Sequence, residues 1–301
     1  MRRLLREILK TTILVVSLFV IVPPAFAAEH EWSEVGKAMG KEGKLYPGNI
    51  YKISLIRDDL NFSIDGIQLK SAILRGSWVA FQKMEDHAMA MADLALTHEE
   101  VRAVTEKLEE SGFEITGLHN HELRLKPAMM YLHAMGYGDP VKLAQALREA
   151  IKRSGTPFKA SQEHSFPVRF SQDSIDNIMG IVSSRVGGVL KYHFSRADEI
   201  KDNGIVMEPA FGPETGIDIQ PLDNKNAAAV GDIGVIASEV QPVVNALRER
   251  GMELTALHNH MVTEKPRLLF VHFWVHGEAE KVASDIRFVL DKVNLKGKPR
   301  G

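Results

Sequence analysis

The chain has 301 residues, of which 45% are hydrophobic and 25% are charged. This composition is typical of a folded soluble protein, and the length is sufficient for two hydrophobic cores. The net charge of −2 argues against a nucleic-acid partner or a polybasic membrane surface. Because the chain contains no cysteine, disulfides, a thiol nucleophile and a lipid-bearing cysteine are all excluded.

Residues 1–27 have the features of a signal peptide. Four basic residues precede an apolar run over about residues 13–22, and Ala25-Phe26-Ala27 offers a cleavage site. The run is shorter than the roughly 20 apolar residues that cross a bilayer. We therefore expect an exported, soluble mature protein, periplasmic or secreted, with no integral membrane segment after cleavage.

The rest of the chain contains an internal repeat with an offset of 139 residues. Leu118–His133 aligns with Leu257–His272 without a gap, and seven of the sixteen positions are identical. We expect a first repeat domain over residues 28–155 and a second over residues 156–301. A polar, proline-containing stretch that begins at Ser154 is the expected linker.

Each repeat predicts the same order of elements. In the first repeat these are strands over Tyr51–Arg57 and Met91–Leu96, a helix over Glu99–Ser111, strands over Phe113–His121 and Ala128–Met135, and a closing helix. In the second they are strands over Leu190–Arg196 and Val230–Ile236, a helix over Glu239–Arg250, strands over Met252–Met261 and Arg267–Val275, and a closing helix. Thr97 with Glu100, and Ser238 with Gln241, predict capping boxes. The fold class is α+β, as two tandem sheet-plus-helices units, with a ferredoxin-like sandwich as first choice.

The chemistry of both repeats is concentrated in their histidines. Residues two apart on a strand face the same side, so His119 projects with His121, and His258 with His260. If the next strand pairs as a hairpin, a third histidine approaches the same face; these are His133 and His272. Three imidazoles with an open position would hold a divalent transition metal, with zinc as the first candidate.

A structural interpretation of the same residues stays open. The imidazoles could bond backbone carbonyls inside a buried sheet, and Asn120 and Asn259 could cap a turn. Duplication would copy either arrangement, so the repeat alone does not decide between a ligand site and a structural network.

The second repeat carries extra groups. The spacing of Glu264 after His258 and His260 resembles the first metal motif of cupins, whereas the first repeat has Leu125 at the equivalent position. Glu264 is therefore the candidate catalytic base of a metal-dependent hydrolase. His276 could extend a site in this repeat.

Other charged residues are weaker candidates. Arg57 with Asp59, and Arg196 with Asp198, alternate on predicted strands. They could form ion pairs or bind a small anionic ligand. Asp93 and Asp232, set among apolar residues, could support a histidine from behind or hydrogen-bond the backbone at a strand end.

The duplicated Leu-His-Asn-His, Lys-Pro and His segments, with Asp93 and Asp232 upstream, resemble a bacterial family of unknown function. That family includes the lipoproteins LppY and LpqO. The resemblance covers nearly the whole mature chain and implies an exported, duplicated protein, without an established activity. This chain differs from those two lipoproteins because it has no cysteine to carry a lipid.

The leading functional expectation is an exported protein that binds a divalent metal or an unknown small polar ligand at the His-Asn-His strands. A metal-dependent hydrolase is the first alternative. A structural or envelope-interaction protein without a site is the second. The two site-bearing alternatives require the histidines to share a face, while the third predicts imidazoles hydrogen-bonded to backbone.

Overall fold

The computed structural model describes residues 24–297 except residues 75, 86 and 160–170. The basic start and apolar run of the predicted signal peptide lie outside the described residues. The first described helix, α1 (Pro24–Met39), includes the last four residues of that predicted segment. Within the described ranges, no helix is both long and apolar enough to cross a membrane.

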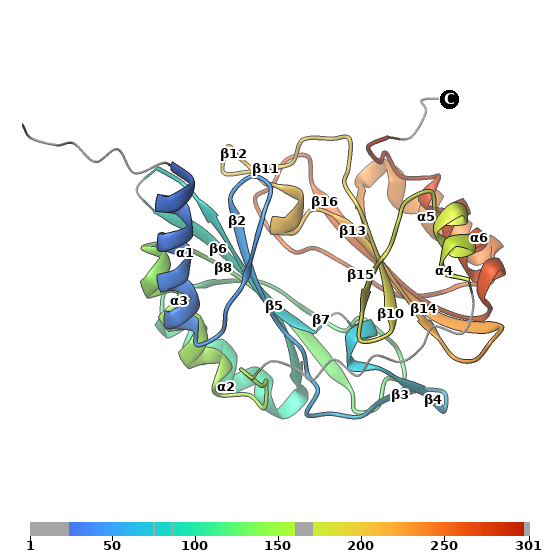
Figure 1. Ribbon diagram of the computed structural model, residues 1–301, viewed down its shortest axis with the longest axis horizontal. Coiled ribbons are helices and arrows are strands. Elements are labelled where there is room, and N and C mark those ends of the chain that lie inside the picture. Colours follow the sequence, from blue (N-terminus) through green and yellow to red (C-terminus); the bar gives the residue numbers. More distant parts are fainter. Residues whose placement is uncertain (1–23, 75, 86, 160–170, 298–301) are drawn as a thin grey trace, which may run out of the picture.

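Each repeat forms a six-stranded antiparallel sheet with helices on its outer face (Figure 1). The elements of the first repeat are α1, β1 (Lys44–Tyr46), β2 (Ile50–Leu55), β5 (Ser77–Lys83), β6 (Ala88–Thr97), α2 (His98–Glu110), β7 (Glu114–His119), β8 (Met129–Gly138) and α3 (Pro140–Ile151). Those of the second are α4 (Gln172–Met179), β9 (Ser184–Val186), β10 (Val189–Phe194), β13 (Thr215–Pro221), β14 (Asn226–Ile236), α5 (Ala237–Glu249), β15 (Glu253–His258), β16 (Leu268–Glu278) and α6 (Ala279–Leu290). The predicted α+β class and the two sheet-plus-helices units are confirmed.

The strand order follows from a split strand–helix–strand unit. The first sheet has the order β1-β2-β5-β6-β8-β7, and the second has the equivalent order. β6 and β7, joined by α2, flank β8, as in a ferredoxin-like sheet. The fourth ferredoxin position beside β6 is filled by β5, which precedes the unit in the chain. The sequence predicts β2 and β6 ahead of α2, whereas β5 is not predicted.

The inner face of each sheet packs against the other repeat and against short segments that leave the sheet, here called excursions. These excursions are β3 (Phe62–Ile64), β4 (Ile67–Leu69) and the 3-10 helix η1 (Ser71–Leu74) in the first repeat, and β11 (Lys201–Asp202), β12 (Ile205–Val206) and the 3-10 helix η2 (Pro209–Phe211) in the second. Phe62 and Ile73 pack in one core with Trp274, and Met91 packs in another with Phe211 and Phe270. The repeats therefore share two cores.

One predicted cap is wrong. The box of Thr97 and Glu100 is present, and the Glu100 carboxylate accepts from the Thr97 amide at 2.8 Å. In the second repeat α5 begins after Ile236, and Glu239 accepts from the Ile236 amide at 2.9 Å. Glu239, the equivalent of Glu100, is therefore the capping residue of this helix, and Gln241 is not. Glu239 supplies the carboxylate that the first turn needs.

Candidate metal centre

The two His-Asn-His segments meet between the repeats. Each segment begins at the end of an edge strand, β7 or β15, and these strands approach each other closely. Gly117 of β7 lies so near that a Cβ there would be 3.0 Å from the Asn259 carbonyl oxygen. The predicted hairpin is confirmed, since β8 brings His133 opposite Gly117. One detail differs, because His121 and His260 lie just beyond their strands rather than on them.

Six histidines form one cluster across this junction, defined here as the histidine cluster: His119, His121, His133, His258, His260 and His272. Three overlapping groups have ligand atoms within 4.8 Å of one another: His119 with His121 and His133, His121 with His258 and His272, and His133 with His258 and His260. Two of the three groups combine residues of both repeats. The sequence predicted each histidine, while the mixing of the repeats was not predicted.

The three closest pairs of imidazole rings each join one repeat to the other. The ring centroids lie 3.3 Å apart for His119 and His258. They lie 3.9 Å apart for His121 and His272, and 4.1 Å apart for His133 and His260. Exchanging each histidine for its equivalent 139 positions away converts one outer pair into the other. The cluster therefore has approximate twofold symmetry.

The aromatic neighbours of the cluster follow the same symmetry. Tyr131 stacks on His121 at 3.3 Å, and the equivalent Phe270 stacks on His260 at 3.5 Å. These rings come from β8 and β16, two positions before the third histidine of each repeat. They restrict the orientation of the outer imidazoles, which favours a preorganised set of nitrogens.

Hydrogen bonds fix the ring orientation of two histidines. Nδ1 of His119 lies 2.9 Å from the Asn120 carbonyl oxygen, and Nδ1 of His258 lies 3.2 Å from the Asn259 carbonyl oxygen. Since a carbonyl only accepts, the proton of each neutral ring is on Nδ1. The lone pair is then on Nε2, and Nε2 of His119 lies 2.7 Å from Nε2 of His133.

Several buried ring nitrogens have no hydrogen-bond partner among the described residues. They are Nε2 of His121, Nδ1 of His133, Nε2 of His258 and both ring nitrogens of His260. Buried polar atoms without partners are rare because their desolvation is uncompensated. The structural interpretation requires these nitrogens to bond backbone carbonyls, so the arrangement favours a site whose ligand completes them.

Burial favours the neutral form of five of the six histidines. It lowers the pKa of His119 to about 4 and that of His258 to about 3. Burial also lowers the pKa of His121, His133 and His260 well below the ordinary value. Neutral imidazole is the form that binds metal, so no proton has to leave before an ion binds near pH 7.

Two carboxylates lie beside the cluster. Asp93 is opposite His133 in the sheet, with Oδ1 4.0 Å from Nδ1 of that histidine. Asp232 Oδ1 lies 3.3 Å from Nε2 of His272, and Oδ2 lies 4.0 Å from Nε2 of His260. That these aspartates support histidines stays a prediction, while their charge would favour a bound cation.

Glu264 and His276 do not join the described cluster. Glu264 is buried, and its carboxylate accepts from the Leu268 amide at 2.9 Å and lies 3.4 Å from Arg267. It belongs to none of the three ligand groups, so its role as a catalytic base stays a prediction. His276 is exposed on β16 and belongs to none of the three groups, so its extension of the site stays a prediction.

The arginine–aspartate pairs form ion-pair networks away from the cluster. Buried Arg57 binds Asp59 at 2.9 Å and Glu100 at 2.8 Å. Arg196 likewise binds Asp198 and, at 2.8 Å, Glu239. Each network holds the end of an early strand to the first turn of a helix.

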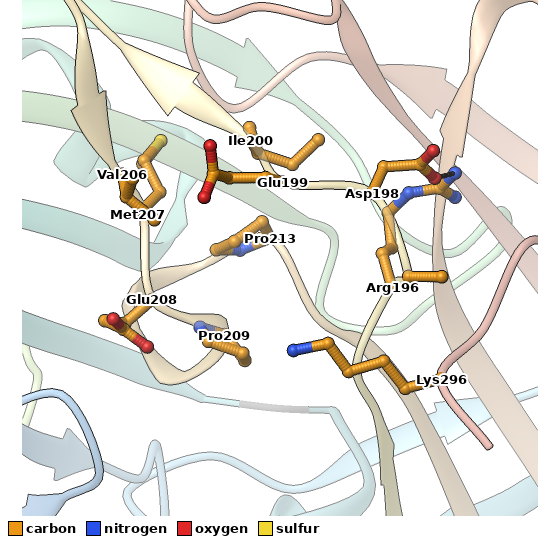
Figure 2. Close-up of a pocket in the computed structure, with 11 residues that line it drawn as sticks. Arg196, Asp198, Glu199, Ile200, Val206, Met207, Glu208, Pro209, Pro213 and Lys296 are labelled. Atoms are coloured by element: carbon orange, nitrogen blue, oxygen red, sulfur yellow. Dashed lines mark hydrogen bonds and ion pairs between the residues drawn. The ribbon is translucent and has the colours of Figure 1, made fainter.

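Arg196 and Asp198 also line a cavity of about 360 Å³. Glu199, Glu208 and Lys296 line the same cavity (Figure 2). The cavity includes no histidine of the cluster. Ligand binding by Arg57, Asp59, Arg196 and Asp198 therefore stays a prediction.

The asparagines of the two motifs have a role that sequence reasoning missed. Asn120 donates to the Thr255 carbonyl at 3.1 Å, and Asn259 donates to the Thr116 carbonyl at 2.8 Å. Both bonds cross between the repeats. In the sequence, each asparagine lies between two candidate metal ligands, and this position was the only sign of such a role. Strand spacing does not predict contacts between the repeats.

Comparisons with known proteins identify a domain without giving an activity. The family described as Domain of Unknown Function (DUF1259) matches residues 33–153 and again residues 173–292. No curated protein matches the chain. These comparisons do not name LppY or LpqO, so that resemblance stays a prediction.

Two solved structures are similar over most of the chain. EtuB from Clostridium kluyveri is 10% identical, with a TM-score of 0.18, and the match covers 82% of this chain and 90% of that one. A trimeric bacterial microcompartment shell protein, PduB, is 12% identical, with a TM-score of 0.20, and the match covers 84% and 90%.

Proposed function

This chain belongs to the family described as Domain of Unknown Function (DUF1259) and carries that domain twice, and we propose that the paired domains bind one divalent transition-metal ion at the histidine cluster. The observation that carries the proposal is the set of buried ring nitrogens without hydrogen-bond partners among the described residues. They belong to the same side chains whose ligand atoms converge within 4.8 Å.

The overlap of the ligand groups supports a stoichiometry of one ion. Any two of the three groups share one histidine, which is His121, His133 or His258. A neutral imidazole has one lone pair and ligates one ion, so two groups cannot be filled at once. Imidazole nitrogens suit zinc, copper, nickel and iron, and zinc remains the first candidate.

Binding is favoured over hydrolysis by the position of Glu264. A metal-dependent hydrolase needs a base near the ion. The Glu264 carboxylate instead contacts the Leu268 amide and Arg267, outside the three groups. The base assigned to the hydrolase alternative thus lies outside the ligand groups, and metal binding is the function that we propose.

We also propose that the protein acts outside the cytoplasm. The basic start, the short apolar run and the Ala25-Phe26-Ala27 site support this. N-terminal sequencing of the protein recovered from periplasmic and culture fractions tests it. We expect a mature start near Ala28, and an intact Met1 on all recovered protein would contradict export with cleavage.

Elemental analysis of untagged protein tests the metal proposal. After exposure to zinc, copper, nickel and iron separately, followed by desalting, we expect one ion per chain for at least one metal. The double variant His121→Ala/His258→Ala removes a ligand from every group and should lose the ion. The variant His193→Ala/His276→Ala, at two exposed histidines, is the matched control and should retain it.

Single variants separate the groups. His119 belongs to one group and His258 to two, although the two residues are equivalent in the repeats. We expect His258→Ala to weaken metal affinity more than His119→Ala. A wild-type protein that retains none of the four metals would overturn the proposed function.

A further inference from the structure

The asparagine in the middle of the first Leu-His-Asn-His segment makes two contacts in different directions. Its backbone carbonyl accepts from Nδ1 of His119 at 2.9 Å. Its side-chain amide donates to the Thr255 carbonyl of the second repeat at 3.1 Å. Asn120 therefore connects the orientation of a candidate metal ligand to the opposite repeat.

Asn259 repeats this arrangement from the other side. Its carbonyl accepts from Nδ1 of His258 at 3.2 Å. Its side-chain amide donates at 2.8 Å to the carbonyls of Thr116 and Met261. Thr116 and Thr255 are themselves equivalent residues, so the two asparagines reach across the junction reciprocally.

The strands around these bonds leave little room for movement. The hydroxyl of buried Thr116 donates to the His260 carbonyl at 2.6 Å. The missing side chain of Gly117 lets β7 approach the Asn259 carbonyl. The backbone of the second motif is thus fastened to the first repeat at consecutive residues, close to the candidate ligands.

We propose that Asn120 and Asn259 are positioning residues that couple contact between the repeats to metal affinity. This inference rests on the proposed function. Each asparagine carbonyl holds the Nδ1 proton of the preceding histidine and so presents Nε2 to the ion, while the side-chain amide fixes that carbonyl against the other repeat. Supporting bonds of this kind set the tautomer and orientation of ligating histidines, and their loss costs about 10- to 100-fold in metal affinity.

Variants that remove only the crossing amide test the inference. Asn120→Leu and Asn259→Leu keep the backbone carbonyl and a similar side-chain volume, but they have no side-chain donor. The probe is Co²⁺ bound to the full mature chain, followed by its visible absorption, by competition for affinity and by release to a chelator. We expect about 10- to 100-fold weaker binding, faster release and an altered absorption spectrum.

A second contact between the repeats provides the control. Arg124 binds Glu253 at 2.7 Å but belongs to no ligand group. Arg124→Met should lower thermal stability while leaving the Co²⁺ spectrum and release rate as in the wild type. Asn120→Ala and Asn259→Ala, which also have no side-chain donor, replace a leucine variant that does not fold.

The outcomes distinguish the two proposals. If the asparagine variants change Co²⁺ affinity and spectrum no more than Arg124→Met does, the asparagines only hold the repeats together and the inference is overturned. If the wild-type protein binds no Co²⁺, zinc, copper, nickel or iron, the proposed function fails, and the inference fails with it.

Discussion

At the scale of single residues, the cluster depends on imidazoles that stay uncharged. Placing a positive charge on a buried ring removes it from water without compensation, so burial lowers the pKa. This is the cause of the low pKa values of His119, at about 4, and His258, at about 3. The same property that keeps the rings available to a metal makes the metal-free protein sensitive to acid.

The sign of this sensitivity follows from proton linkage. An unfolded histidine titrates near pH 6.5 and the folded His119 near 4, so the unfolded state binds more protons between these values. Stability of the metal-free protein should be complete above pH 6.5 and fall steadily as pH drops toward 4. Urea unfolding at several pH values measures this. The prediction would be contradicted if the free energy of unfolding did not change between pH 7 and 4.5 in both the wild type and His121→Ala/His258→Ala.

Glu264 gives a second residue-scale prediction. Its carboxylate accepts from the buried Leu268 amide, whereas the first repeat has the apolar, buried Leu125 at the same position. Glu264→Leu should leave that amide without its acceptor and cost about 1–3 kcal/mol of stability. Metal affinity should change by less than threefold. If Glu264→Leu lost metal while its stability stayed unchanged, Glu264 would be part of the metal site.

At the scale of elements, the approach of β7 to β15 decides how the cluster is assembled. A Cβ at Gly117 would lie 3.0 Å from the Asn259 carbonyl oxygen and 3.1 Å from Cδ2 of His133. One neighbour is backbone and the other is a candidate ligand, so neither can move without disturbing the cluster. Gly117→Ala should therefore lower stability by about 1–3 kcal/mol and weaken metal binding.

Ala256, the equivalent of Gly117 on β15, supplies the comparison for that prediction. Ala256→Gly removes a methyl group at the same register position, opposite His272, and introduces no new contact. Thermal unfolding and metal titration of both variants measure the difference. Equal effects of the two substitutions would show that strand flexibility, rather than close approach, is responsible.

Elements were predictable where the pattern is local. The helical stripes and the Thr97 cap lie within a few residues of each other, and the third histidine follows from hairpin pairing. β6 reads as a continuous apolar run because it is buried on both faces: Ala90 and Leu94 pack under the helices, while Met91 packs against the other repeat. A single sequence does not say what covers that second face, so the shared cluster could not be derived from it.

At the scale of the whole molecule, the same junction carries both the shared cores and the candidate ion. Phe62 and Trp274 belong to one mixed core, and Met91 and Phe270 to the other. Phe270 also stacks on His260. Separating the repeats would expose apolar surface and divide the ligand groups at once, so the pair of repeats is the expected unit of folding and of binding.

Metal should therefore stabilise both repeats together. An ion that binds only the folded chain adds about 2.7 kcal/mol at a free concentration 100-fold above its dissociation constant. Calorimetry of the full mature chain with and without zinc should show one transition that moves to higher temperature. His121→Ala/His258→Ala should show no such shift, because each ligand group has lost a member. Two transitions, of which zinc moves only one, would mean that a single repeat holds the ion and that the groups joining both repeats are not its ligands.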